Sequence, residues 1–180
     1  MRIIAGAWRG RPLAAPAGAG TRPTSDRARE GLFSMLQSRL GSFEGLKVAD
    51  LFAGTGALGL EALSRGADHC TFVENGRTAL LTLRQNVDRL GADARADIRA
   101  QTLEHASPPA HPCDLLLMDP PYDVGLAEAA LRHVANSSWL APGALVSVEA
   151  DRPLAPPPGL NPEADRRFGK AHVTLLRWDA

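Results

Sequence analysis

A glycine-rich loop and a carboxylate beyond it are the first residues whose spacing suits chemistry. Gly54, Gly56 and Gly59 follow a G-x-G-x-x-G pattern between a predicted strand and a predicted helix. Glycines there let backbone N–H groups approach a nucleotide-like ligand at the start of the helix. Glu74 lies 15 residues after Gly59, at the end of the next predicted strand, where a carboxylate accepts hydrogen bonds from ribose hydroxyls. The combination indicates an adenosine-containing ligand at the carboxyl edge of a sheet, although the glycine pattern alone is weak.

Asp50, four residues before Gly54, indicates which adenosine ligand fits. Dinucleotide-binding loops usually carry an apolar or small residue at this position, because a carboxylate there would repel a pyrophosphate. S-adenosylmethionine has an ammonium, a sulfonium and no phosphate, so its charge suits Asp50. The position therefore favours S-adenosylmethionine and disfavours a dehydrogenase. The structural alternative is that Asp50 only caps the turn.

The acidic tetrapeptide Asp119-Pro120-Pro121-Tyr122 follows another predicted buried strand. An amino group on an aromatic base is a poor nucleophile, because its lone pair is delocalised into the ring. If the Asp119 carboxylate and the Pro120 carbonyl each accept one N–H, the lone pair turns toward an incoming methyl group. Tyr122 offers a ring on which an extruded base can stack. The tetrapeptide predicts methylation of a base amino group; the alternative is a Pro-Pro turn with an exposed aspartate.

The charge of the chain is unevenly distributed although it sums to zero. The first 24 residues hold no acid and carry a charge of +4, so residues 25–180 must sum to −4. The arginines of this arm are Arg2, Arg9, Arg11 and Arg22. Four arginines beside Trp8 suit the surface of a polyanion such as RNA. The alternatives are that the arm is a solvated terminus and that Trp8 anchors it to the core.

Length and composition indicate an ordinary globular protein. A chain of 180 residues with 44% hydrophobic residues can bury a core without disulfides or metals. Cys70, Cys113 and the five histidines show no metal-ligand spacing, and free thiols are typical of a reducing compartment. No apolar run approaches the roughly 20 residues of a membrane span, and residues 1–6 are too short for a signal-peptide core. We therefore expect a cytoplasmic protein without a metal site.

Strands and helices alternate along the chain, which predicts an α/β fold with a parallel sheet covered on both faces. The predicted helices are residues 26–40, a helix from the glycine loop to Gly66, one from an Asn75 cap to residue 90, and 126–135. The predicted strands are residues 46–52, 70–74, 96–100, 114–118 and 144–149, with a terminal pair at 166–168 and 171–178. Five prolines between 152 and 162 predict a loop.

The sequence resembles a known family, the RsmD-like 16S ribosomal RNA guanine-N2 methyltransferases, which belong to the class I S-adenosylmethionine-dependent enzymes. The resemblance covers nearly the whole chain. It rests on residues 2–11 (RIIAGAWRGR), 22–30 (RPTSDRARE), 50–59 (DLFAGTGALG) and 119–122 (DPPY). The first two blocks are the more diagnostic, because many methyltransferases share the glycine loop and DNA adenine methyltransferases share the acidic tetrapeptide.

The resemblance implies a Rossmann-like, seven-stranded, mostly parallel sheet with helices on both faces. It also implies a small N-terminal β-hairpin within residues 1–24 that contacts RNA, ahead of a methyltransferase domain at 25–180. The implied target is the N2 amino group of a guanine in 16S ribosomal RNA, at position 966, during maturation of the small ribosomal subunit. The partner would be this RNA or the assembling subunit, and nothing indicates an obligate dimer, so we expect a monomer.

The resemblance also assigns residues to roles. Cofactor binding is implied for Arg22, Thr24, Asp50, Phe52, Gly54, Thr55, Gly56, Glu74 and Thr102. Catalysis is implied for Asp119, Pro120 and Tyr122, and RNA binding for Trp8, Arg9, Arg11 and Pro121. The segment with Arg22 and Thr24 either closes over the methionine moiety or touches RNA.

One position departs from the related enzymes. They often place Asp or Asn after the third strand to bind the adenine amino group, whereas this chain has Gln101-Thr102-Leu103. Thr102 or a backbone carbonyl would have to substitute. Two other functions stay open from the sequence: N6-adenine methylation of DNA, and a non-catalytic RNA-binding module for ribosome assembly.

Overall fold

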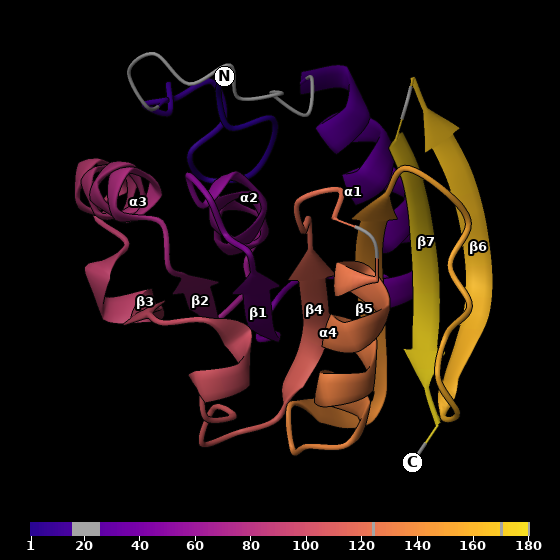
Figure 1. The fold of residues 1–180 in the computed structure, drawn as a ribbon. Coiled ribbons are helices and arrows are strands. Elements are labelled where there is room, and N and C mark those ends of the chain that lie inside the picture. The colour runs from indigo at the N-terminus through magenta and orange to yellow at the C-terminus, as the bar shows by residue number, and fades with distance from the viewer. Residues whose placement is uncertain (16–25, 124, 170, 180) are drawn as a thin grey trace.

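The computed structural model describes residues 1–15, 26–123, 125–169 and 171–179. A seven-stranded sheet runs through the middle of the protein, in the order β3-β2-β1-β4-β5-β7-β6 (Figure 1). Its strands are β1 Lys47–Leu51, β2 His69–Glu74, β3 Ala96–Ala100, β4 Cys113–Met118, β5 Leu140–Ala150, β6 Leu160–Phe168 and β7 Ala171–Trp178. The first five are parallel, and β7 pairs antiparallel with both β5 and β6. The expected seven-stranded, mostly parallel sheet is confirmed.

Helices cover both faces of this sheet, as predicted. On one face lie α1 (Asp26–Leu40), α2 (Ala57–Ser64) and α3 (Arg77–Leu90), and on the other lies α4 (Leu126–Ala135). Figure 1 shows α2 and α3 above the sheet and α4 on its opposite side. Two short 3-10 helices, η1 (Asp93–Arg95) and η2 (Leu103–His105), flank β3.

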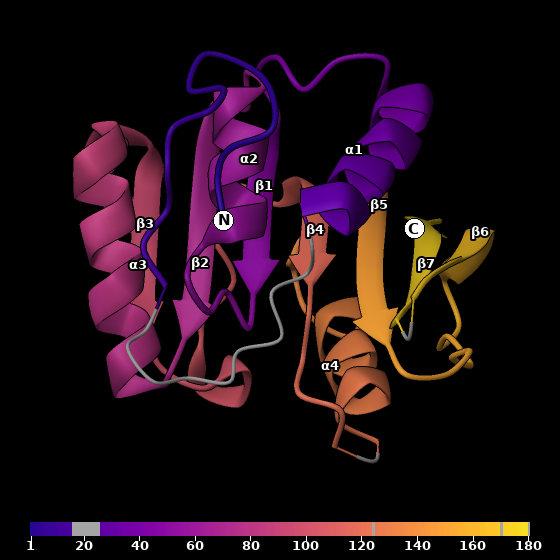
Figure 2. The same cartoon turned by 90° about the horizontal axis from the view of Figure 1, so that it is seen from above.

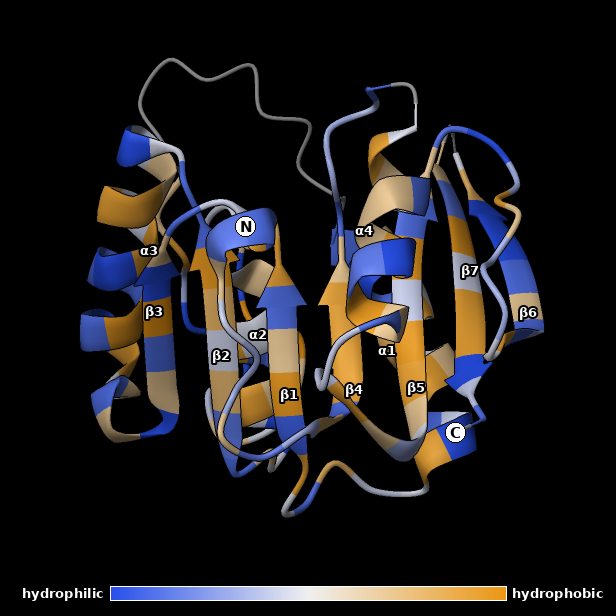
Figure 3. Cartoon of the chain, turned by 60° about the horizontal axis from the view of Figure 1, so that its bottom comes forward, coloured by the Kyte–Doolittle hydropathy of each residue, from blue (hydrophilic) through white to orange (hydrophobic). Residues whose placement is uncertain are grey.

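The side chains of β4 show why the sequences of the central strands are continuously apolar. Leu115 and Leu117 pack with the helices α1 to α3, whereas Leu116 and Met118 pack with α4. All four are at most 1% exposed, because a parallel strand between two helical layers has no solvated face. The edge strand β6 is mostly hydrophilic by comparison (Figure 3).

Two strands, β5 and β6, begin several residues earlier than the sequence predicts. β5 starts at Leu140, which pairs with Cys113 across a bulge in β4–β5. β6 starts at Leu160, inside the stretch predicted to be a loop, and contains Pro162. An edge strand tolerates a proline that cannot donate to the ladder, and the register shifts between Pro162 and Ala164. The predicted loop is therefore wrong for its last three residues.

The predicted start of the third helix is also wrong. α3 begins at Arg77 with Gly76 as its N-cap, and no side chain caps it. Asn75 lies outside the helix, and its backbone N–H donates to Glu74 Oε1 at 2.9 Å.

The described part of the arm, which we call the N-terminal segment (residues 1–15), lies over α2 and α3 (Figure 2). A single antiparallel bridge joins Arg2 to Pro12, and the backbone N–H groups of Ile3, Gly10 and Leu13 donate across the turn to the carbonyls of Arg11, Ile3 and Met1. The expected small hairpin is therefore present, without extended strands. Ile3 and Leu13 are buried in the core formed with α1 to α3. Residues 16–24 of the arm, with Arg22 and Thr24, lie outside the described residues.

Cys70 and Cys113 are both buried and free. In the part of the chain that the structure describes, no helix has the length and apolar character of a membrane span.

Candidate active site

The glycine loop (residues 53–59) leads from β1 into the first turn of α2 at the carboxyl edge of the sheet. Gly54 and Gly56 have φ values of 56° and 78°, in the left-handed region where side chains are disfavoured. Phe52, directly before the loop, has a φ of 59°, and it is the one non-glycine residue with positive φ among those described. Strained backbone of this kind concentrates at ligand sites. Phe52 also lines a cleft of about 530 Å³ together with Leu103.

The three glycines are required for different reasons. A Cβ at Gly56 would lie 2.4 Å from Leu83 Cδ1, and a Cβ at Gly59 would lie 2.4 Å from Phe72 Cε1. These two glycines let α2 pack closely on the core. Among the described residues, a Cβ at Gly54 would meet only the Phe52 carbonyl oxygen, at 4.0 Å. The described part of the chain therefore leaves the space beside Gly54 open for a ligand.

Asp50, on β1, is 1% exposed. Its Oδ2 accepts a hydrogen bond from the Gly59 N–H at 2.9 Å, so it braces the start of α2 as the turn-capping alternative expects. Burial raises the pKa of Asp50 well above its usual range; the Gly59 N–H opposes this shift, and the charges of Asp119 and Glu74 add to it. The charges of two carboxylates thus act on a third at this edge, and a ligand with positive charge would relieve this repulsion.

Glu74 ends β2, and its carboxylate holds the backbone around it. Oε2 accepts from the Gly54 N–H at 2.7 Å. Oε1 accepts from the N–H groups of Asn75 at 2.9 Å and Gly76 at 2.6 Å. The side chain assigned to the ribose therefore also fixes the glycine loop against the entry to α3.

The acidic tetrapeptide directly follows β4, where Met118 pairs with Leu51 of β1. Asp119 is half-buried, Pro120 is buried and Pro121 is exposed. The Tyr122 hydroxyl donates to Glu149 Oε1 at 3.1 Å. Glu149, on β5, was not predicted from the sequence; the only signal was a charged residue at the end of an apolar strand.

Thr102 follows β3 beside Glu74, since Ala100 pairs with Glu74. Its hydroxyl lies 2.9 Å from His105 Nδ1. Its carbonyl accepts from the N–H groups of His105 and Ala106. Both polar groups of Thr102 are thus engaged in the η2 turn.

The N-terminal segment is held by residues that the sequence did not single out. Glu61 of α2, fully buried, accepts from the N–H groups of Ile4 and Ala5 at 2.7 and 3.0 Å. The Ser64 hydroxyl accepts from the Trp8 N–H at 3.0 Å and donates to the Ala5 carbonyl at 2.6 Å. The signal that could have revealed Glu61 is a lone acid among the apolar residues of α2.

The predicted RNA-contacting residues of this segment differ in their surroundings. Arg9 is exposed, and Arg11 donates to the Arg89 carbonyl at the end of α3. The Trp8 ring packs against the core, with the Arg95 guanidinium 4.9 Å from its centroid. This packing favours the anchoring alternative for Trp8.

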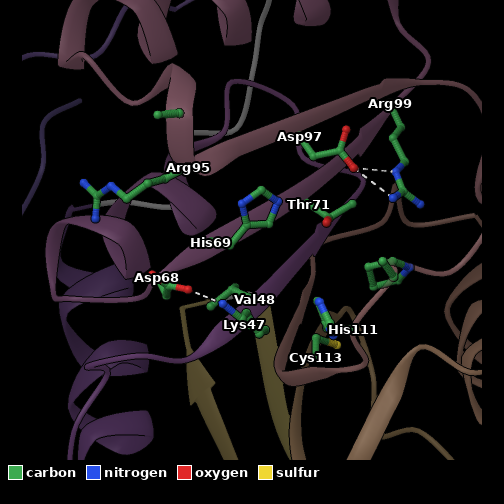
Figure 4. Close-up of a pocket in the computed structure, with 13 residues that line it drawn as sticks. Lys47, Val48, Asp68, His69, Thr71, Arg95, Asp97, Arg99, His111 and Cys113 are labelled. Carbon is green, nitrogen blue, oxygen red and sulfur yellow. Dashed lines mark hydrogen bonds and ion pairs between the residues drawn. The ribbon is translucent and has the colours of Figure 1, made fainter.

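A separate hollow of about 400 Å³ lies at the amino ends of the strands, where Lys47, His69 and Cys113 begin β1, β2 and β4 (Figure 4). Four of its charged residues form two ion pairs, Lys47 with Asp68 and Arg99 with Asp97, whereas Arg95 donates to the carbonyls of Leu63 and Ala67. None of the described residues assigned above to cofactor, catalysis or RNA lines this hollow.

Comparisons with known proteins agree with this geometry. A family model described as "Conserved hypothetical protein 95" matches residues 1–177. The Ribosomal RNA small subunit methyltransferase D of Haemophilus influenzae is 39% identical over 163 residues, covering 87% of this chain and 83% of that protein. The protein of the same name from Escherichia coli K12 is 38% identical over 151 residues, covering 84% and 75%. A solved Escherichia coli structure described as a methyltransferase superposes with a TM-score of 0.88 at 34% identity, covering 100% of this chain and 98% of that one.

The sheet order, the glycine loop and the carboxylates around it define a class I methyltransferase, a class that uses S-adenosylmethionine. Within that class, the chain belongs to the RsmD family. The residues present fit the cofactor, because the space beside Gly54 is open and the buried Asp50 favours a positively charged ligand.

Proposed function

We propose that this protein transfers a methyl group from S-adenosylmethionine to the N2 amino group of a guanine in 16S ribosomal RNA. The observation that carries the proposal is the position of Asp119 at the carboxyl end of β4: it directly follows Met118, which pairs with Leu51, the neighbour of Asp50 on β1. Target-orienting and cofactor-binding groups would then share one edge of the sheet.

The residues at this edge of the sheet have two roles: some bind the cofactor and others orient the target amino group. Asp50, Gly54, Gly56 and Glu74 bind the cofactor, with Phe52, Thr55 and Thr102 lining its surroundings. When bound, S-adenosylmethionine supplies an activated methyl group. The Asp119 carboxylate and the Pro120 carbonyl each accept one N–H of the target amino group, which turns the nitrogen lone pair toward the methyl carbon. As the new N–C bond forms and the S–C bond breaks, the nitrogen releases a proton to Asp119 or to water.

Tyr122 and the arm serve the RNA in this proposal. The Tyr122 ring stacks on the extruded guanine, worth about 1–3 kcal/mol, which offsets much of the cost of unstacking it. Pro121, exposed beside it, also faces RNA. Arg9 and Arg11 contact phosphates, and Arg22 and Thr24 either close over the cofactor or extend this surface. Relatives named for methylation of small-subunit ribosomal RNA support this substrate class.

The finer assignments belong to the same proposal. The target is guanine 966, the substrate is 16S ribosomal RNA or the assembling small subunit, and the protein acts as a monomer in the cytoplasm. Residues 1–24 form the RNA-contacting extension of a methyltransferase domain at 25–180.

The test is methyl transfer from labelled S-adenosylmethionine to small ribosomal subunits of cells lacking the enzyme, with duplex DNA in parallel. Mass spectrometry of the nucleosides should detect N2-methylguanosine in 16S ribosomal RNA and no methylated DNA. N6-methyladenine in the DNA would instead establish the adenine alternative. RNA binding without any methyl transfer would establish the non-catalytic module.

A further inference from the structure

Asn86 is a polar residue on the apolar face of α3. Its side chain is completely buried, beside the core residues Leu83, Val87 and Leu90 of the same helix. A buried amide costs free energy unless its donors and acceptor are bonded. The partners of Asn86 therefore show what the residue does.

Those partners lie in two segments far apart in the sequence. Asn86 Oδ1 accepts from the Ala14 N–H at 2.7 Å, and Nδ2 donates to the Ala14 carbonyl at 3.2 Å. Nδ2 also donates to the Thr55 carbonyl, between Gly54 and Gly56 of the glycine loop, at 3.0 Å. One amide thus joins the end of the N-terminal segment to the middle of the glycine loop.

We propose that Asn86 is a positioning residue that couples cofactor binding to RNA binding. A ligand that fixes the glycine loop holds the Thr55 carbonyl in place, and with it the amide that pairs with Ala14. An RNA that fixes the N-terminal segment acts on the same amide from the other side. Each ligand then favours the conformation that the other binds, and the coupling is reciprocal. This inference rests on the proposed function, because it takes RNA as the ligand of the segment.

Ser64 provides a matched control within the same segment. Its hydroxyl bonds Ala5 and Trp8, both in the N-terminal segment, and Ser64 is 3% exposed; in the part of the chain that the structure describes, this hydroxyl makes no hydrogen bond to the glycine loop. Ser64→Ala therefore loosens the segment without touching the bond between Asn86 and the glycine loop. A loss of coupling specific to Asn86 cannot be attributed to loosening alone.

The experiment is calorimetry with S-adenosylhomocysteine, which has no methyl group to transfer, with and without unmethylated 16S ribosomal RNA. In the wild-type protein we expect RNA to raise the affinity for S-adenosylhomocysteine by about fivefold or more, and the nucleoside to raise the affinity for RNA by the same factor. In Asn86→Ala both factors should fall to about one, whereas Ser64→Ala should keep them.

A second variant protects the test against a folding defect, which thermal unfolding would detect. Ala14→Pro removes the N–H that donates to Asn86 Oδ1 and leaves the bond between Asn86 and Thr55 in place. It should also abolish the coupling. Coupling that persists in whichever of the two variants folds would overturn the inference.

The measurements on the wild-type protein distinguish a failure of the coupling role of Asn86 from a failure of the proposed function. Methyl transfer to RNA with no coupling in the wild-type protein would overturn the role of Asn86 and leave the proposed function intact. A wild-type protein that neither binds nor methylates RNA would overturn both.

Discussion

The Gly54 N–H donates to Glu74 Oε2 at 2.7 Å, so the carboxylate at the end of β2 holds the glycine loop that begins after β1. The other oxygen of Glu74 accepts from the N–H groups of Asn75 and Gly76. The conformation of the glycine loop therefore depends on the side chain to which the proposed function assigns the ribose.

Glu74→Gln should weaken the cofactor site and the fold together. The amide has only one acceptor oxygen, so at least one of these backbone N–H groups would face an NH₂ group, at a cost of about 1–3 kcal/mol. We expect the affinity for S-adenosylhomocysteine to fall about 10-fold or more in calorimetry, and the melting temperature to fall by several degrees. Glu44→Gln, at an exposed position, is the control and should change neither. An unchanged affinity in Glu74→Gln would contradict the role of this carboxylate.

Asp50→Asn should lower the affinity for the cofactor, and its effect on the stability of the fold should depend on pH. Burial raises the pKa of Asp50 in the folded protein, so its favourable contribution is complete below the unfolded pKa of about 3.9 and is lost as the pH rises through the raised value. The variant cannot ionise, so its melting temperature relative to wild type should increase from about pH 4 to pH 8. Its affinity for S-adenosylhomocysteine should fall about 10-fold or more, because the charged partner of the ammonium is gone. A stability difference that does not change with pH would contradict this account.

Two Tyr122 variants distinguish the contribution of the ring to methyl transfer from that of its hydroxyl. Tyr122→Phe keeps the ring and removes the bond to Glu149, so kcat/KM for methyl transfer should fall by less than about 10-fold. Tyr122→Ala also removes the stacking surface, worth about 1–3 kcal/mol, and should cost a further factor of about 5–150. Equal losses in the two variants would show that the ring does not meet the base.

Much of the fold follows from local sequence signals. The bounds of α1, α4 and β3 agree with the predictions. In the two helices, periodic apolar residues mark the element, and a glycine marks one end: Gly41 after α1 and Gly125 before α4. The early start of β6 could not be predicted, because Pro162 is acceptable only in a strand at the edge of the sheet. That position depends on the order of strands far apart in the chain.

The candidate site likewise has a part that could be predicted from the sequence and a part that could not. The glycine loop, Glu74 and the acidic tetrapeptide are contiguous motifs, and the parallel sheet brings their ends to one edge. Glu61 and Asn86 were not predicted, because each bonds backbone groups of the N-terminal segment that lie more than 50 residues away in sequence. The only local signal for either is a polar residue on an apolar helix face.

The arm should contribute to RNA affinity mainly through charge. Replacing Arg9 and Arg11 with Gln should lower the magnitude of the slope of log K against log salt by about 0.7 for each lost phosphate contact with single-stranded RNA. Filter binding over a salt series measures this slope. Arg166→Gln is the control, because Arg166 is exposed on β6, at the opposite edge of the sheet from the N-terminal segment (Figure 2). A slope equal to that of the wild-type protein would show that these arginines do not contact phosphate.

The central claim is that Asp119 aims the target nitrogen without being needed to hold the cofactor. The most direct measurement is the single-turnover rate of methyl transfer to 16S ribosomal RNA by Asp119→Ala, alongside its affinity for S-adenosylhomocysteine. We predict a rate lower by about 10²–10³ or more, with the affinity changed by less than about fivefold. A wild-type rate in this variant, or a loss of rate that follows entirely from lost cofactor binding, would contradict the account.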